Sequence, residues 1–447
     1  ADFAVAGRAM PFYVVTATVF ATWFGSETVL GIPATFLKEN LRGVIADPFG
    51  SSLCLILVGL FFAVPLYRQK LLTIGDYYRG RYNRTVEVVT SLAIVVSYLG
   101  WVGAQIKALG LVFNVVSNDA ISTQLGMLLG AASVLVYTLF GGMVSVAITD
   151  LVQMVVIVIG MLYIGWDISD RAGGVTTVIQ HAAESGKFEF WPEMNVTAIL
   201  GFFAAWITMM FGSIPQQDVF QRVMSSKTAK IAMWASVLGG VLYFGFAFVP
   251  MFLAYSATLI DAPLVAKYLE QDSQLILPKL IINHAPVFAQ IMFFGALLSA
   301  IKSCASATLL APSITFAENI LKPMFPAMDD RKFLRLMRSV VLGFTALVLV
   351  YALNTEASIF KMVENAYQVT LVSAFVPLVA GVYWKRANAL GGMLSMFAGL
   401  IVWIGMLIVA PDAAMPPQLA GVLASAVGMV AGSYWPSRQT SSVTNPL

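Results

Sequence analysis

Residues 14–33 read Val14-Val15-Thr16-Ala17-Thr18-Val19-Phe20-Ala21-Thr22-Trp23-Phe24-Gly25-Ser26-Glu27-Thr28-Val29-Leu30-Gly31-Ile32-Pro33. A transmembrane helix needs about 20 mostly apolar residues, and this stretch is long enough, but the polar patch Gly25–Thr28 interrupts it. A carboxylate such as that of Glu27 costs about 3 kcal/mol or more at the centre of a bilayer, and irregular backbone persists there only against protein or a polar cavity. The stretch therefore predicts a broken membrane helix in the wall of a solute site.

The composition of the whole chain indicates a membrane protein with many spans. Of 447 residues, 59% are hydrophobic and 11% are charged, whereas soluble globular chains have roughly 25% charged residues. The net charge of +3 is too small to indicate a nucleic-acid partner. The two cysteines, Cys54 and Cys304, both lie in apolar segments, which argues against a disulfide framework, and two histidines form no zinc pattern. No paired carboxylates, activated nucleophile or phosphate loop indicate an enzyme.

Twelve apolar segments follow one another along the chain. We predict membrane helices at 11–37, 46–66, 85–117, 121–141, 143–166, 195–221, 230–256, 285–320, 337–353, 357–384, 390–410 and 415–434. Most Lys and Arg residues lie in the loops on the side of residue 1, such as the basic stretch 68–84. The positive-inside rule then places residue 1 and the C-terminal tail in the cytoplasm. We expect an integral protein of a bacterial inner (plasma) membrane.

Two features of these segments recur five helices apart. The third and eighth segments, 85–117 and 285–320, are unusually long. The first and sixth, 11–37 and 195–221, are each broken by small or polar residues. This pattern predicts a five-plus-five inverted repeat with the solute site between the two broken helices. The predicted division of one transmembrane domain, 1–447, is a first repeat at 11–168, an inverted repeat at 195–384 and two additional helices at 389–435.

Several motifs along nearly the whole chain, in the expected order, resemble the sodium/solute symporter family. They are Asp2-Phe3-Ala4-Val5-Ala6-Gly7-Arg8, Thr16-Ala17-Thr18-x-x-Ala21-Thr22-Trp23-Phe24-Gly25, Gly141-Gly142-Met143-x-Ser145-Val146-x-x-Thr149-Asp150-x-x-Gln153, Gly212-Ser213-Ile214-Pro215-Gln216-Gln217-Asp218-Val219-Phe220-Gln221-Arg222 and Gly295-Ala296-Leu297-Leu298-Ser299-Ala300. The chain looks most like the branch that contains the high-affinity choline transporters and bacterial uptake proteins. This resemblance implies an all-α, leucine-transporter-like fold, alternating access and sodium coupling. Family members have one more helix before the Ala-Gly-Arg motif, and we expect that helix to be missing from this sequence.

The resemblance also implies a sodium site between the broken first helix and the eighth helix. In the family, a dehydrated sodium ion is bound there by backbone carbonyls and hydroxyls. The matching positions are Ala21, Phe24, Ala300, Ser303 and Cys304. Cys304 offers a sulfur where the family has a hydroxyl, and soft ligands suit hard cations poorly. The resemblance implies sodium as the coupling ion, whereas Cys304 argues against it; proton-coupled or sodium-independent transport that uses Lys302 is the alternative. We expect no organic cofactor.

Lys302, next to this site, has two interpretations. It can lie at the edge of the hydrocarbon and extend to water. Alternatively, it is buried, pairs with Glu27 or replaces the ion, and acts as a coupling group together with Glu27. Lys107 is a second candidate partner for Glu27, and the sequence does not choose between the two lysines.

The candidate solute site combines aromatic residues with one carboxylate. Cation–π attraction contributes about 2 kcal/mol for a desolvated contact, so such a site suits an organic cation or the ammonium group of an amino acid, with a small carboxylate as a further candidate. The predicted binding residues are Trp23, Glu27, Tyr98, Trp101, Gln105, Ser213 and Gln216. The resemblance implies that tryptophans at the positions of Trp23 and Trp101 line an aromatic cage in the choline-type relatives. The other interpretation is that these tryptophans only pack or lie at the membrane interface.

Three further acidic or basic residues are interpreted as structural. Asp150 is expected to cap backbone or pair with a loop arginine at a cytoplasmic turn. Asp218 and Arg222 are four residues apart, which predicts an intrahelical ion pair or part of an inner gate. Together these features favour a secondary transporter that imports a small polar or cationic solute. The remaining alternatives are a transporter-like sensor domain and, with less support, a channel.

Overall fold

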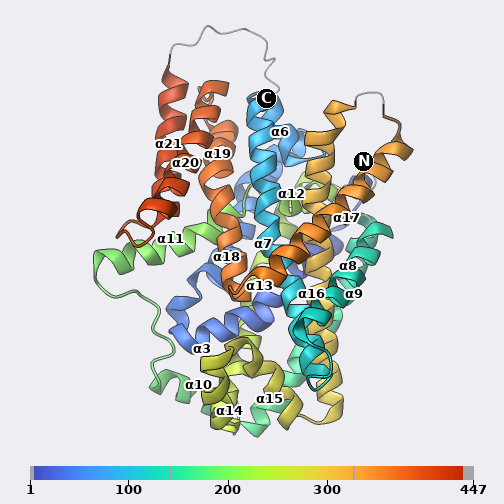
Figure 1. Ribbon diagram of the computed structural model, residues 1–447, viewed down its shortest axis with the longest axis vertical. Coiled ribbons are helices and arrows are strands. Elements are labelled where there is room, and N and C mark those ends of the chain that lie inside the picture. The colour runs from blue at the N-terminus through green and yellow to red at the C-terminus, as the bar shows by residue number, and fades with distance from the viewer. Residues whose placement is uncertain (1–4, 141–142, 326–327, 436–447) are drawn as a thin grey trace.

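The structure is a computed structural model that describes residues 5–140, 143–325 and 328–435. Within these ranges every regular element is a helix, and the only β-type contact is an isolated bridge between Met10 and Ser226. The expectation of an all-α chain is confirmed. The helices run side by side as one bundle (Figure 1).

The first half of the bundle contains the first five predicted membrane segments. The first segment consists of α2 (Phe12–Trp23), η2 (Glu27–Gly31) and α3 (Ile32–Gly43). The second consists of η3 (Ile45–Gly50), α4 (Ser51–Leu57), η4 (Val58–Phe62) and α5 (Ala63–Arg68), and the short α6 (Ile74–Arg81) follows it. The next three are α7 (Arg84–Val116), α8 (Thr123–Phe140) and α9 (Met143–Arg171), followed by the short α10 (Val175–Glu184).

The second half contains the sixth to tenth segments. These are α11 (Val196–Gly212) with α12 (Gln217–Ser225), α13 (Ala229–Ile260), α16 (Val287–Thr315) with η6 (Phe316–Leu321) and η7 (Lys322–Met324), α17 (Asp330–Asn354), and α18 (Ile359–Thr370) with η8 (Leu371–Phe375) and α19 (Val376–Tyr383). Between α13 and α16 lie α14 (Ala262–Gln271), η5 (Ser273–Leu275) and α15 (Ile276–His284). Two final helices, α20 (Ala389–Val409) and α21 (Pro417–Tyr434), pack along each other at one edge of the bundle (Figure 1).

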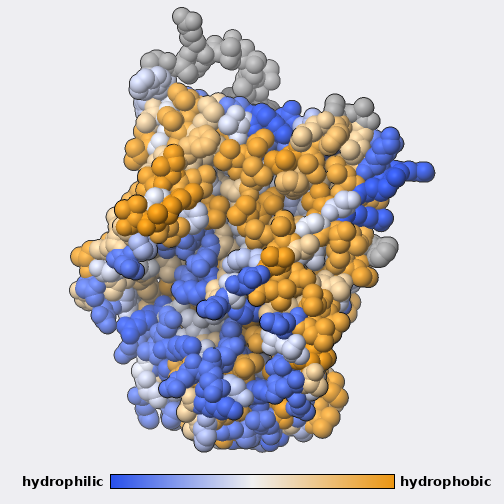
Figure 2. All heavy atoms as spheres, in the orientation of Figure 1, coloured by the Kyte–Doolittle hydropathy of each residue, from blue (hydrophilic) through white to orange (hydrophobic). Residues whose placement is uncertain are grey.

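All twelve predicted segments have a helical counterpart, but their lengths differ. Among the described residues, eight helices are long and apolar enough to cross a membrane, or nine if α11 and α12 count as one bent span. The apolar helices Phe12–Trp23 and Thr123–Leu139 are shorter. Figure 2 shows apolar side chains over much of the surface and hydrophilic ones concentrated at the end that carries α10, α14 and α15. The chain is therefore a polytopic membrane protein with a polar cap at that end.

The helix boundaries follow from residues that suit them. Asn83 begins α7 by accepting a hydrogen bond from the Val86 amide at 2.9 Å, and Thr228 begins α13 in the same way. The first segment is broken because Phe24 leaves helical geometry, with ψ of 78°. In the sixth segment the turn before Gln217 contains Pro215, which has no amide hydrogen to donate, and the two halves meet at a bend of 42°. Both predicted breaks therefore exist, and each leaves backbone groups that need other partners.

Candidate functional site

The break in the first helix is held by Gln105 of α7. Its side-chain oxygen accepts a hydrogen bond from the Ser26 amide at 2.9 Å, and its nitrogen donates to Glu27 Oε2 at 2.7 Å. Gln105 is fully buried, so it satisfies a freed backbone donor and a carboxylate that water does not reach. Gln105 was predicted to lie in the solute site, and these two contacts bring it to the break.

Glu27 receives its other hydrogen bond from a neutral donor. The indole nitrogen of Trp101 donates to Glu27 Oε1 at 3.3 Å, and the Glu27 side chain is only 2% exposed. Among the described residues, no lysine or arginine forms a salt bridge with Glu27. The carboxylate is thus buried without a cation of the protein beside it.

The predicted pairing of Glu27 with Lys302 or Lys107 is therefore wrong in this conformation. Lys107 donates to the backbone oxygens of Thr355 at 3.4 Å and Ala357 at 2.7 Å. Lys302 is partly exposed and lies over the ring of Tyr137, with its nitrogen 5.9 Å from the ring centroid. Lys302 thus contacts Tyr137 of α8, and its extension to the edge of the hydrocarbon stays a prediction.

Four aromatic side chains form a cluster beside Glu27, and we call Trp23, Tyr98, Trp101 and Tyr367 the aromatic cluster. The ring centroids of Trp23 and Trp101 are 5.5 Å apart, and each lies near Tyr367, at 6.2 and 5.5 Å respectively. Tyr98 stacks on Trp101 at 6.0 Å. All four rings are buried. Because they touch one another, a solute enters the cluster only if the rings separate.

Tyr367 was not predicted from the sequence. It lies on α18, in the tenth segment, more than 200 residues from the other rings. The signal for it was weak, since a tyrosine in an apolar helix more often packs or lies at the membrane interface. Its membership in the cluster depends on how α18 crosses α7, which packs against it.

The break in the sixth helix is held from the third and tenth segments. Gln216 donates from its side-chain nitrogen to Ser97 Oγ at 2.9 Å and Thr370 Oγ1 at 3.2 Å, and Thr370 donates to the Gly212 oxygen at 2.7 Å. Ser213 is buried, and its hydroxyl has no hydrogen-bond partner among the described residues. The two predicted residues therefore differ in their hydrogen bonding. The Gln216 side chain already bonds to Ser97 and Thr370, whereas the Ser213 hydroxyl is available to bond to a solute.

Of the predicted sodium residues, the structure brings Cys304 directly against the first break. Ala21, Phe24, Ala300, Ser303 and Cys304 are all buried. A Cβ atom on Gly25 would lie 2.8 Å from the sulfur of Cys304, so the break packs directly on α16. Gly25 is required there because any larger side chain would collide with Cys304 and with Glu27. The approach of Gly25 to Cys304 places α16 next to the break, and the binding of an ion by these residues stays a prediction.

Asp150 also belongs to this region, which was not expected from the sequence. Ser303 donates a hydrogen bond to Asp150 Oδ1 at 2.5 Å, and the Asp150 side chain is fully buried on α9. The predicted role of Asp150 as a cap at a turn is therefore wrong. A carboxylate is a hard oxygen ligand, and Asp150 lies next to the hydroxyl expected to bind the ion.

The predicted ion pair between Asp218 and Arg222 is not formed either. Arg222 donates from Nη1 to the backbone oxygen of Asp218 at 3.2 Å, and the Asp218 carboxylate accepts a hydrogen bond from the hydroxyl of Tyr98. Arg222 is nevertheless 2% exposed and close enough to Asp150 and Asp218 to interact with both charges. We call Asp150, Asp218 and Arg222 the inner charged cluster.

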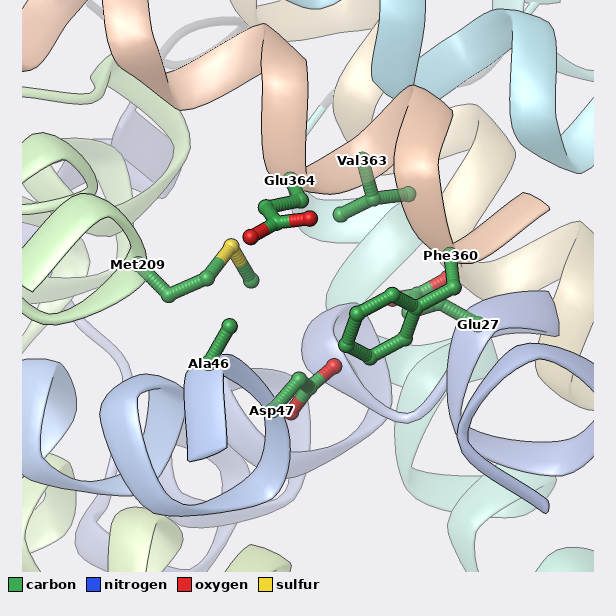
Figure 3. A pocket seen from close by; sticks show the side chains of 7 residues that line it. All are labelled: Glu27, Ala46, Asp47, Met209, Phe360, Val363 and Glu364. Carbon is green, nitrogen blue, oxygen red and sulfur yellow. The ribbon is translucent and has the colours of Figure 1, made fainter. Parts of the chain in front are cut away.

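A narrow recess opens on the other side of Glu27 (Figure 3). In this conformation the recess is too tight to hold a water molecule, and its lining comes from η2, η3, α11 and α18. Three carboxylates face it, namely those of Glu27, Asp47 and Glu364 (Figure 3). Asp47 and Glu364 were not predicted from the sequence, although both lie inside apolar segments, where an acidic residue is a functional candidate for the same reason as Glu27.

Comparisons with known proteins agree with this architecture. A model of the sodium:solute symporter family matches residues 3–399. The human high affinity choline transporter 1 is 27% identical over 417 residues, which cover 90% of this chain and 70% of that protein. The sodium/pantothenate symporter of Haemophilus influenzae is 25% identical over 441 residues, covering 96% and 89% of the two chains.

A solved structure of a Na⁺-coupled sialic acid symporter, in a substrate-bound outward-open state, has the same fold. It superimposes with a TM-score of 0.78 at 20% identity and covers 97% of this chain and 91% of that chain. The fold is thus the leucine-transporter-like inverted repeat with discontinuous first and sixth core helices, and α20 and α21 are additional to it. The relatives are transporters, which agrees with the expectation that the protein is not an enzyme.

Proposed function

Because the chain belongs to the sodium:solute symporter family, we propose that it is a secondary active transporter that imports a small organic cation or amino acid by alternating access. The relatives named above transport choline, pantothenate and sialic acid, as their names state. They differ in the charge of their solutes, so the solute of this chain has to be inferred from its own residues.

The observation that supports a cationic solute is the environment of Glu27. This carboxylate is buried, receives hydrogen bonds from the neutral side chains of Gln105 and Trp101, forms no salt bridge with a described residue, and lies beside the aromatic cluster. A buried charge is costly unless an opposite charge accompanies it. A cationic solute supplies that charge, and the faces of Trp23 and Trp101 add cation–π attraction once the rings separate around it.

For the coupling ion, we propose sodium at the first break. The backbone oxygens of Ala21, Phe24 and Ala300 and the hydroxyl of Ser303 supply hard ligands, and Asp150 supplies a full negative charge next to Ser303. This charge compensates for the poor ligand Cys304. Lys302 lies beside Tyr137, so we propose no ion-replacing role for it.

The orientation is also a proposal. The distribution of Lys and Arg favours a cytoplasmic location for α6 and for the loop between α16 and α17. The polar end with α10, α14 and α15 is then external (Figures 1 and 2). We further propose residues 11–168 and 195–384 as the two repeats, with α20 and α21 outside them.

Transport into proteoliposomes tests this function. Radiolabelled choline, ethanolamine and glycine would each be offered with an inward sodium gradient, and with potassium in its place. We expect sodium-driven uptake of at least one of them by the wild type, with little uptake by Glu27→Gln. Ser303→Ala should weaken the apparent sodium affinity more than the solute affinity. Glu189→Gln is the matched control, because Glu189 is exposed and forms only a loose pair with Arg42 at 3.9 Å.

Other results would contradict the proposal in specific ways. Uptake that does not depend on sodium, is driven by a proton gradient and is lost in Lys302→Met would contradict sodium coupling. It would support the alternative in which Lys302 is the coupling group. Solute binding without uptake in any gradient would favour a sensor. Uptake that is unchanged in Glu27→Gln would remove the carboxylate from the solute site.

A further inference from the structure

The recess beside Glu27 carries a site that the fold and the relatives do not assign. We infer that Glu27, Asp47 and Glu364 form a binding subsite for an organic cation bearing N–H groups, such as a primary ammonium, next to the aromatic cluster. The inference rests on the proposed cationic solute and narrows it from organic cations in general to those that donate hydrogen bonds.

The three carboxylates are buried and face one recess although they come from three different segments (Figure 3). Glu27 is 2%, Asp47 is 3% and Glu364 is 7% exposed. The other lining residues, Ala46, Met209, Phe360 and Val363, are apolar. A charge among such residues is poorly solvated, so its interactions with a ligand are stronger than they would be in water.

The protein itself supplies only one cation to these three charges. Lys361 pairs with Glu364 at 2.6 Å. Asp47 accepts a hydrogen bond from the hydroxyl of Tyr243 at 2.7 Å, and among the described residues neither Asp47 nor Glu27 forms a salt bridge. Two buried carboxylates facing one recess without an internal cation create a site where a positive ligand is strongly favoured.

The recess and the aromatic cluster are physically connected. Glu27 belongs to both, because it lines the recess and accepts the hydrogen bond of Trp101. Tyr243 bonds to Asp47 through its hydroxyl, and its ring lies 6.5 Å from that of Trp23. Glu364 and Tyr367 are three residues apart on α18, a spacing that places them on the same helix face. A ligand that enters the recess when its lining side chains separate therefore lies directly beside the cluster.

The geometry favours an organic cation over a metal ion. Among the described residues, no group of three or more His, Cys, Asp or Glu side chains is close enough to hold one metal ion. The separated carboxylates instead suit a cation whose donors point in several directions. An ammonium group has three N–H donors and makes charge-assisted hydrogen bonds to carboxylates. A quaternary ammonium has none, and it therefore adds no hydrogen bond to the carboxylate oxygens.

Ethanolamine and choline are a matched pair of probes, because both contain a hydroxyethyl group and they differ only in the three N-methyl groups. Apparent dissociation constants would be measured by thermal-shift titration of the purified full chain in saturating sodium. We expect the wild type to bind ethanolamine about tenfold or more tighter than choline, the effect of a hydrogen bond to a charged group. In Asp47→Asn and Glu364→Gln the preference should fall severalfold, whereas Glu189→Gln should keep it.

Two variants guard against a folding defect. The amide of Asp47→Asn still accepts the hydrogen bond of Tyr243, and Glu364→Gln changes the recess from a different helix, so either one alone decides the result. Equal binding of choline and ethanolamine by the wild type, or an undiminished preference in both variants, would overturn the subsite while leaving a cationic transporter in place. Stabilisation by pantothenate but by neither amine would overturn both the subsite and the proposed cationic solute.

Discussion

The recess and the inner charged cluster both bury two or more carboxylates, but they neutralise them differently. The inner charged cluster contains its own cation, since Arg222 lies close to Asp150 and Asp218. In the recess, Glu27 and Asp47 have only neutral hydrogen-bond donors beside them. Because a buried charge needs an opposite charge, the inner cluster has a cation from within the protein, whereas for the recess we propose a cation from outside. This difference separates a structural charge network from a binding site.

The largest effect is expected from removing Arg222. Arg222→Met deletes the cation of the inner charged cluster and leaves Asp150 and Asp218 buried without it, which should cost about 3–5 kcal/mol of stability. The melting temperature and the yield of folded protein in detergent would measure this. Arg171→Met is the control, because Arg171 is exposed and pairs with Asp167 within its own helix at 3.0 Å. If both variants melt alike, Arg222 does not neutralise the inner cluster.

Neutralising Glu27 should have the opposite effect on stability. Glu27→Gln removes a buried charge that has no internal cation, so the ligand-free protein should be as stable as the wild type or more stable. Its affinity for ethanolamine should fall by about 1.5–3 kcal/mol, the contribution of a hydrogen bond to a charged group. Thermal unfolding with and without ethanolamine separates the two effects. A variant that melts several degrees lower without ligand would show that the protein itself neutralises the Glu27 charge, and the contrast with the inner cluster would fail.

The next effect concerns the proposed sodium site. Ser303→Ala removes a hydroxyl ligand and the hydrogen bond to Asp150, and it should weaken sodium binding by about 1–1.5 kcal/mol, as for an average hydrogen bond. The sodium dependence of ethanolamine binding is the measurement. Ser395→Ala is a suitable control, since Ser395 is buried but bonds only to Ser425 at 2.8 Å, between the last two helices. Equal sodium dependence in both variants would place the ion elsewhere.

The smallest effect is expected where charges remain in water. His284 lies 2.7 Å from Asp261 just beyond α13, and this hydrogen bond holds the pKa of Asp261 below its ordinary value. The stability gained is therefore present above the ordinary carboxyl pKa and is lost as the pH falls through the lowered one. For a partly exposed pair it should be about 0.2–1 kcal/mol. Melting temperatures of wild type and Asp261→Asn between about pH 3 and pH 7 should converge toward the acid end, and a constant difference would contradict the assignment.

The sequence alone determined the class of the protein and the positions of its breaks. An apolar composition and a membrane-spanning length are properties of continuous segments, so the membrane helices and the interruptions at Gly25–Thr28 and near Pro215 could be found without any tertiary contact. The motifs around them indicated the family. The prediction also grouped Glu27, Trp101 and Gln105 in one site. A polar residue in a membrane helix almost always faces the interior of the bundle or a water-filled cavity.

Tertiary structure decided which side chains meet. The rotation of α16 about its axis directs Lys302 toward Tyr137 and Ser303 toward Asp150, and adjacent residues on a helix point about 100° apart, so sequence position alone could not assign their partners. The site also contains Asp47, Glu364 and Tyr367, which contacts between distant segments bring together. Some of these segments are more than 300 residues apart in the sequence. The sequence shows that a buried charge must be neutralised, but only the packing of the helices shows whether the protein or a ligand does it.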